Sequence, residues 1–255
     1  MDARAYLKMA ESEQTHWWYV ARRRLLKAVL ASLKFPSNAG LLEVGCGTGG
    51  NLALLAQFGD VKAIEMDARA REIAVRAKGA EQAIVRPGRM PDQNPFADEK
   101  FDGIFLFDVL EHIDRDFETL RTLRDCLTHD GRIVVTVPAY KWLWGRHDEV
   151  LHHHRRYVKG ELRDLFHRAG YSVARISYFN TFLFPLVAVT RLWEKAGWNA
   201  EVAGQATPPT ILNKVLARVF ASETRLVLTT GLPFGVSILC IASAQREGEY
   251  RKIIA

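Results

Sequence analysis

A glycine-rich turn at residues 45–50 constrains this chain more than any other feature, because it separates an apolar strand from a helix. Residues 41–50 read LLEVGCGTGG, with glycines at alternate positions. A Cβ there would fill ligand space or forbid the backbone angles of a tight turn. Glu43, two residues before the first glycine, is unsuited to a phosphate site. The turn is therefore expected to hold a nucleotide-like cofactor with a positively charged end.

Two further segments follow in the order that such a cofactor site requires. Glu65 ends the next short apolar strand, about 20 residues on, where a carboxylate accepts hydrogen bonds from both ribose hydroxyls. Asp67 is predicted to cap the helix that follows. Residues 101–113, FDGIFLFDVLEHI, form the third segment, with Asp108 after a strand. S-adenosylmethionine (SAM) fits this acidic pattern, because its ammonium and sulfonium groups are positive.

These segments resemble the class I SAM-dependent methyltransferases, whose first motif is E/D-x-G-x-G-x-G and whose fourth strand leads into D-V-L-E-H-I. Residues 16–23 also match H-W-W-[FY]-x-A-R-R, and residues 153–157 match H-x-R-x-Y, patterns that resemble a subgroup related to ubiquinone-pathway methyltransferases. The resemblance implies methyl transfer, with SAM as cofactor and S-adenosylhomocysteine as product. After the fifth strand, the positions that match the subgroup are His147, Asp148, His153, Arg155 and Tyr157.

The resemblance also implies a set of cofactor-binding residues. Gly88-Arg89-Met90-Pro91 departs from the family pattern, because many relatives carry an aspartate there for the adenine amino group. Backbone groups near Arg89 and Met90 are expected to replace it, with Met90 packing on the adenine ring. The full predicted set is Trp18, Arg22, Glu43, Gly45, Cys46, Gly47, Gly49, Glu65, Met66, Asp67, Arg89, Met90, Asp108 and Val109.

The alternation of strands and helices predicts an α/β fold with a Rossmann-like, doubly wound sheet. Seven strands are expected, mostly parallel with an antiparallel last strand, at 40–45, 61–65, 82–86, 101–107, 131–137, 171–178 and 234–244. Helices are expected at 50–58, 68–78, 114–128 and 159–169. We expect a single domain over 1–255, made of an N-terminal helical cap (1–35), a core (36–178 and 233–246) and a helical insert or lid (179–232).

Composition limits the cellular setting and the partners. The net charge of +6 permits an acidic partner, such as nucleic acid or an anionic membrane surface, without requiring one. Three widely spaced cysteines without a C-x-x-C motif suit a reducing compartment, so we expect a cytoplasmic protein, with peripheral membrane contact left open. The most apolar stretch, 179–189, is too short to span a bilayer and contains Pro185.

Methyl transfer needs an aligned acceptor and, for a hydroxyl acceptor, a base. A phenol of pKa about 10 is about a thousandth ionised at neutral pH, a deficit of roughly 4 kcal/mol. Ligands collect at the carboxyl ends of strands in open α/β sheets, so titratable side chains after the fourth and fifth strands are candidates. We predict methyl transfer to oxygen of a small-molecule or lipid-like acceptor with a histidine as base, and catalytic candidates His112, Tyr140, His147, His153 and Tyr157.

Several alternatives stay open at this stage. The histidine-rich segment and the N-terminal helix have purely structural interpretations, and the insert could be a packed lid, an acceptor groove or a membrane-facing patch. Asp108, Glu111 and His112 could share a helix face as metal ligands, although no metal is expected, because L-E-H-I also occurs in non-metal relatives. The rival functions are an RNA or tRNA methyltransferase and a non-catalytic SAM-binding protein. The oligomeric state is not predicted.

Overall fold

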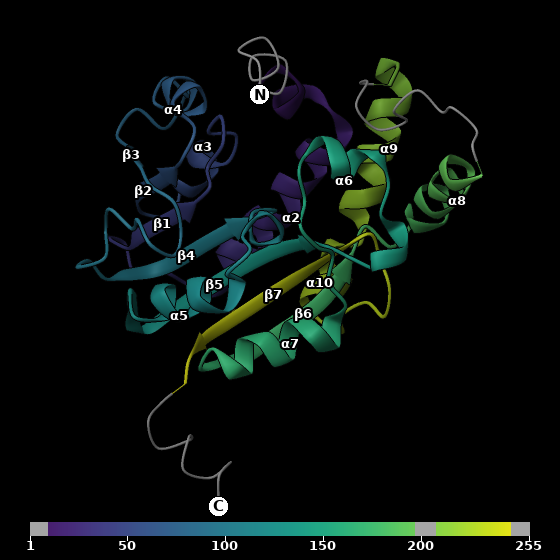
Figure 1. Cartoon of the computed structure of the whole chain (residues 1–255). Coiled ribbons are helices and arrows are strands. Elements are labelled where there is room, and N and C mark those ends of the chain that lie inside the picture. Colours follow the sequence, from purple (N-terminus) through teal and green to yellow (C-terminus); the bar gives the residue numbers. More distant parts are fainter. Residues whose placement is uncertain (1–9, 197–207, 246–255) are drawn as a thin grey trace, which may run out of the picture.

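A seven-stranded sheet forms the centre of the computed structural model, which describes residues 10–196 and 208–245 (Figure 1). The strand order is β3-β2-β1-β4-β5-β7-β6. The neighbours β3-β2, β2-β1, β1-β4 and β4-β5 are parallel, whereas β7 runs antiparallel to both β5 and β6. This topology confirms the predicted fold. The strands are β1 (Gly40–Val44), β2 (Asp60–Glu65), β3 (Ile84–Pro87), β4 (Phe101–Phe107), β5 (Leu127–Pro138), β6 (Tyr171–Phe179) and β7 (Ser237–Ala244).

Helices cover both faces of the sheet, because successive strand residues point to opposite sides. Leu42 and Ile104 pack in the cluster that includes α5 and α7, while Leu41 and Phe105 pack in the cluster that includes α2 and α9. The helices are α2 (Trp17–Leu33), α3 (Leu52–Leu55), α4 (Ala68–Ala74), α5 (Asp116–Arg124), α6 (Arg146–Val150), α7 (Lys159–Arg168), α8 (Phe184–Lys195), α9 (Thr210–Ser222) and α10 (Thr224–Leu228), with 3-10 turns η1 (Leu110–His112) and η2 (Lys141–Leu143).

The predicted boundaries fail most clearly at β5. The fifth strand was expected to begin at Gly131, yet β5 begins at Leu127 and runs through Asp130 and Gly131, a pair typical of turns. Leu127 pairs with Phe101, and the register then shifts between Phe101 and Gly103. Gly131 fits this shift, because a Cβ there would lie 2.9 Å from the Phe101 carbonyl oxygen. The helix expected over 114–128 is therefore the shorter α5, and turn residues inside a strand mark a register change instead of a break.

Among the described residues between β6 and β7, the chain forms helices α8, α9 and α10. Helix α9 packs on α2, where the Asn213 side chain accepts from the Trp17 amide at 2.7 Å and the Phe220 and Trp17 rings lie 6.3 Å apart. Among residues 10–196 and 208–245, none of the helices combines the length and apolarity needed to cross a bilayer. The division into cap, core and insert stays a prediction, and its residues 1–9, 197–207 and 246 lie outside the described residues.

Candidate active site

The glycine turn directly follows β1 and packs between Val109, just after β4, and Ala74 of helix α4. Gly45, Gly47 and Gly49 have φ angles of 70°, 55° and 88°, which favour glycine over residues with a Cβ. A Cβ on Gly45 would also lie 2.7 Å from both methyl carbons of Val109. A Cβ on Gly49 would lie 3.0 Å from the Cα of Ala74. The turn is thus a close-packed cradle that has no room for a side chain at Gly45 or Gly49.

The carboxylate at the end of β2 is fixed beside this turn. Glu65 accepts from the Gly47 amide at 2.9 Å through one oxygen and from the Asp67 amide at 2.8 Å through the other. Asp67 caps α4 as predicted, accepting from the amides of Arg69 and Ala70. A carboxylate held at a strand end next to a glycine turn is the arrangement that binds ribose hydroxyls in nucleotide-binding folds.

Glu43 lies deeper than the sequence suggests. Its side chain is buried, and Oε1 accepts from the Asn51 side-chain amide at 2.9 Å. Oε2 has no hydrogen-bond partner among the described residues. Burial outweighs the bond from Asn51 and raises the pKa of Glu43 to about 8. Glu43 therefore supports the turn from within, and its contact with a cofactor stays a prediction.

The N-terminal segment contacts both the residue after β4 and the glycine turn. Arg22 of α2 forms an ion pair with Asp108, which follows β4 with a φ of 58°. The Arg22 guanidinium also lies 4.6 Å from the centre of the Trp18 ring. Glu13 accepts from the Thr48 hydroxyl of the glycine turn at 2.6 Å. Residues far apart in the sequence thereby close one side of the cradle.

The remaining predicted cofactor residues differ in exposure. Met66 and Arg89 are exposed, whereas Cys46 and Met90 are buried. Met90 belongs to the apolar cluster that includes Ile64, so an adenine ring could contact it only where that cluster meets the surface. Sequence reasoning gave no role to Glu13, Thr48 or Asn51, since their partners are set by tertiary contacts.

Three of the five catalytic candidates come together at the carboxyl ends of β4 and β5. His112 lies in η1, His147 in α6, and His153 follows α6. The His153 ring lies 4.6 Å from the His112 ring and 6.3 Å from the His147 ring, in edge-to-face geometry. Burial lowers the pKa of both His112 and His147 to about 4, so both are neutral at pH 7.

Asp148 distinguishes His153 from the other two histidines. The Asp148 carboxylate is fully buried and lies 2.8 Å from Nδ1 of His153. It also accepts from Arg156 at 2.7 and 3.0 Å and from the Gly145 amide at 2.9 Å. Burial opposes ionisation, but the bonds from His153 and Arg156 hold the pKa of Asp148 well below its usual range. Because Asp148 stays ionised, Nδ1 of His153 is the donor in this contact.

Arg156 was missed at the sequence level, although it is adjacent to a matched position. Arg155, the matched residue, pairs instead with Asp116 at 2.7 Å in a more exposed position. Alternation of the chain after α6 decides which arginine points inward, and the doubled Arg155-Arg156 pair was the only signal for this in the sequence.

Glu111 is a buried carboxyl beside the histidines. Its side chain is 0 % exposed, and neither carboxylate oxygen has a hydrogen-bond partner among the described residues. Burial raises its pKa well above the usual value. One ligand atom from each of Glu111, His112 and His153 lies within 4.8 Å of the others, so these three could hold a divalent ion. The set differs from the sequence alternative, because Asp108 is engaged by Arg22 and His153 takes its place.

The two tyrosine candidates lie in other surroundings. The Tyr157 hydroxyl donates to Asp116 at 2.9 Å, and burial raises its pKa. Tyr140 stacks on Tyr178 with ring centres 5.1 Å apart and also contacts Trp142 and Phe184. Within the described part of the chain, the hydroxyls of Tyr157 and Tyr140 form no hydrogen bond with any of the three histidines. Tyr140 thus belongs to an aromatic cluster with Trp142, Tyr178 and Phe184.

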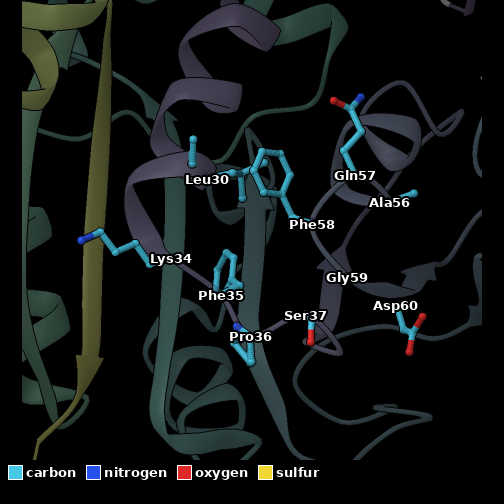
Figure 2. A pocket seen from close by; sticks show the side chains of 11 residues that line it. Leu30, Lys34, Phe35, Pro36, Ser37, Ala56, Gln57, Phe58, Gly59 and Asp60 are labelled. Atoms are coloured by element: carbon cyan, nitrogen blue, oxygen red, sulfur yellow. The ribbon is translucent and has the colours of Figure 1, made fainter.

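A separate shallow pocket of about 420 Å³ lies next to the amino ends of β1 and β2 (Figure 2). Its lining includes Lys34, Phe35, Phe58 and Asp60. Open α/β sheets bind their ligands at the carboxyl ends of the strands, at the opposite edge. This pocket is therefore not part of the candidate active site.

Fold and site together define an α/β enzyme with a nucleotide-cofactor cradle at the carboxyl ends of its parallel strands. Residues 17–201 match the model of the family described as a methyltransferase domain. The chain belongs to this methyltransferase family. The predicted enzyme class is thereby confirmed. The subgroup resemblance and the relation to ubiquinone-pathway enzymes stay predictions.

Individual relatives are distant. The O-methyltransferase resE of Aspergillus sclerotiorum is 27% identical over 136 residues, which are 51% of this chain and 50% of resE. The match thus spans about half the length of this curated relative. A chain from the complex of the Haloferax volcanii Trm112 methyltransferase activator with a methyltransferase superposes with a TM-score of 0.62 at 17% identity, covering 92% of this chain and 93% of that one. Geranyl diphosphate C-methyltransferase from Streptomyces coelicolor superposes with a TM-score of 0.56 at 15% identity, and the superposition covers 86% of this chain and 76% of that one.

Proposed function

We propose that the enzyme methylates an oxygen atom of a small-molecule or lipid-like acceptor, with His153 as the general base. The observation that carries this proposal is the 2.8 Å contact between Nδ1 of His153 and the buried Asp148 carboxylate. Such a pair orients an imidazole and stabilises its protonated form. The name of resE, an O-methyltransferase, supports oxygen as the acceptor atom.

The cradle fits SAM. The turn admits no Cβ at Gly45, and the Glu65 carboxylate lies beside it to accept ribose hydroxyls. When bound, SAM supplies a methyl group on a positively charged sulfur. Asp108 with Arg22 would border the amino-acid end of the cofactor, and the other residues proposed to hold it are those predicted from the sequence. The chain's own task is to align the acceptor, which contributes up to roughly 7–11 kcal/mol, and to remove its proton.

In this proposal the acceptor hydroxyl gives its proton to Nε2 of His153. The resulting imidazolium is stabilised by Asp148, whose charge is itself balanced by Arg156. His112 and His147 remain neutral because of their lowered pKa values and shield the base from water. General base catalysis of this kind contributes about 10²- to 10⁴-fold to the rate.

The aromatic cluster of Tyr140, Trp142, Tyr178 and Phe184 supports an apolar or aromatic acceptor. Tyr140 and Trp142 follow β5 and precede the segment that carries His147, whereas Tyr178 lies near the end of β6 and Phe184 begins α8. Flat apolar walls bind ring systems and hydrocarbon chains better than sugars. The Streptomyces coelicolor enzyme is described with geranyl diphosphate, an isoprenoid acceptor, which supports the lipid-like alternative.

The test is S-adenosylhomocysteine formation from SAM with a panel of phenols, isoprenoid alcohols and bulk tRNA. The variant His153→Gln should bind SAM like the wild type in calorimetry while losing about 100-fold or more in turnover. His167→Gln, at an exposed position on α7, is the matched control.

Wild-type turnover in His153→Gln would contradict the base role. Loss of activity in EDTA, with recovery on adding a divalent ion, would contradict it too and would assign Glu111, His112 and His153 to a metal. Methylation of tRNA alone would favour the nucleic-acid alternative.

A further inference from the structure

Helix α8 carries several apolar side chains that are exposed to solvent. None of its residues is buried, and Phe182, just before it, is exposed as well. Along the helix Leu186, Val189 and Trp193 follow at spacings of about one turn, which places them on one side. Leu186 and Leu192 are each 55% exposed. Figure 1 shows α8 at the rim of the molecule, away from the sheet.

Most of the exposed apolar side chains lie on or beside two helices, α8 and α9. The described residues include fifteen large hydrophobic side chains that are exposed, and eight of these lie on residues 182–193 or in the first half of α9. The α9 members are Ile211, Leu212 and Val215, on the side opposite the residues that pack on α2. A helix of a soluble domain normally turns its apolar stripe inward, so an outward stripe indicates a binding surface.

The charges on these two helices are mostly basic. Helices α8 and α9 carry Arg191, Lys195, Lys214 and Arg218 but a single acid, Glu194. Glu194 pairs with Arg191 at 2.8 Å, and Lys195 donates to the Trp142 carbonyl, so Lys214 and Arg218 of α9 are the basic side chains left beside the exposed apolar ones. The whole chain, these helices included, carries a net charge of +6. Apolar side chains bordered by lysine and arginine match the surface of a bilayer that contains anionic lipids.

The inner side of α8 is attached to the acceptor region. Lys195 donates to the Trp142 carbonyl at 2.6 Å, and the Trp142 and Phe184 rings lie 5.9 Å apart. A Cβ on Gly145, just before α6, would lie 2.7 Å from the Glu194 carboxylate. The same helix therefore presents its outer face to solvent and its inner face to the loop that leads to His147.

We propose that α8, helped by the start of α9, docks on anionic membranes, so that the enzyme takes its acceptor from the lipid bilayer. The docking follows from the surface alone, while the statement about the acceptor rests on the proposed function. The charge pattern favours a lipid surface over a second copy of the chain, because two copies would bring like charges together.

The experiment is co-sedimentation of the full chain with vesicles of phosphatidylcholine alone or mixed with phosphatidylglycerol. The wild type should bind the mixed vesicles, bind the neutral ones weakly and dissociate in high salt. Leu186→Ser/Leu192→Ser should reduce binding about tenfold or more, because it removes two apolar anchors. Val75→Ser/Ile84→Ser removes two exposed apolar side chains outside this surface and should bind like the wild type.

Equal binding by the α8 variant and the wild type would overturn the proposal, as would equal binding to neutral and anionic vesicles. Light scattering that shows a dimer dispersed by Leu186→Ser/Leu192→Ser would assign the surface to a second copy and also overturn it. His153→Gln separates this inference from the proposed function, because that variant should bind vesicles like the wild type even if the acceptor chemistry is different.

Discussion

Replacing Glu43 with glutamine tests whether this acid of β1, two residues before the glycine turn, is held neutral by burial. Glu43→Gln keeps an oxygen for the Asn51 amide and removes the titrating group. The pKa of Glu43 is raised from 4.5 to about 8, so between these values the folded protein holds a proton that the unfolded chain has released. Stability from this group is therefore complete at low pH and is lost as pH rises towards 8.

The magnitude follows from the two pKa values. Linkage gives a loss of roughly 3 kcal/mol in the free energy of unfolding between about pH 5.5 and about pH 8.5 for wild-type Glu43. Glutamine does not titrate, so the variant should lack this part of the pH dependence. Other groups titrate in the same window, but they are shared by both proteins and cancel in the difference.

The assay is urea unfolding of the full chain without SAM at the two pH values, with tryptophan fluorescence as the readout. Glu72→Gln, at an exposed position on α4, is the matched control and should keep the wild-type pH dependence. If Glu43→Gln lost as much stability with rising pH as the wild type, the reasoning about the buried carboxyl would be refuted.

Two further predictions concern the cradle. Gly45→Ala should cost about 1–2 kcal/mol for a positive φ and about 1–3 kcal/mol for overpacking against Val109, and adding Val109→Ala should recover part of the second amount in urea unfolding. A wild-type midpoint for Gly45→Ala would contradict the packing argument. Glu65→Ala should weaken SAM binding in calorimetry by about 1.5–3 kcal/mol, the value of a hydrogen bond to a charged group. Unchanged affinity in Glu65→Ala, judged against Glu72→Ala, would remove Glu65 from the site.

Local signals in the sequence predicted the elements that hold the cradle. An apolar run followed by alternate glycines specifies β1 and its turn, because few backbones other than a left-handed turn use glycines in this way. Glu65 and Asp108 could be located because Glu65 ends a strand, Asp108 directly follows one, and parallel strands end at one edge. The sequence failed at β5, where residues typical of a turn lie inside the strand.

The catalytic candidates were predicted as a group but not as individuals. His112, His147 and His153 were chosen for their position after β4 and β5, and the structure brings these three together. Tyr157 was chosen by the same rule, yet its hydroxyl pairs with Asp116. Side-chain direction after a strand depends on loop geometry, which residue types alone do not specify.

The sequence by itself determined the methyltransferase class and the place of the cofactor cradle, since both depend on short-range backbone requirements of glycines and strand-end carboxylates. Only the tertiary structure decided that Asp148 and Arg156 support His153, that Glu111 is buried beside it, and that α8 turns an apolar face outward. The physical reason is that burial, ion pairing and exposure are properties of contacts between distant segments. Such contacts form only when the sheet and its helices pack together.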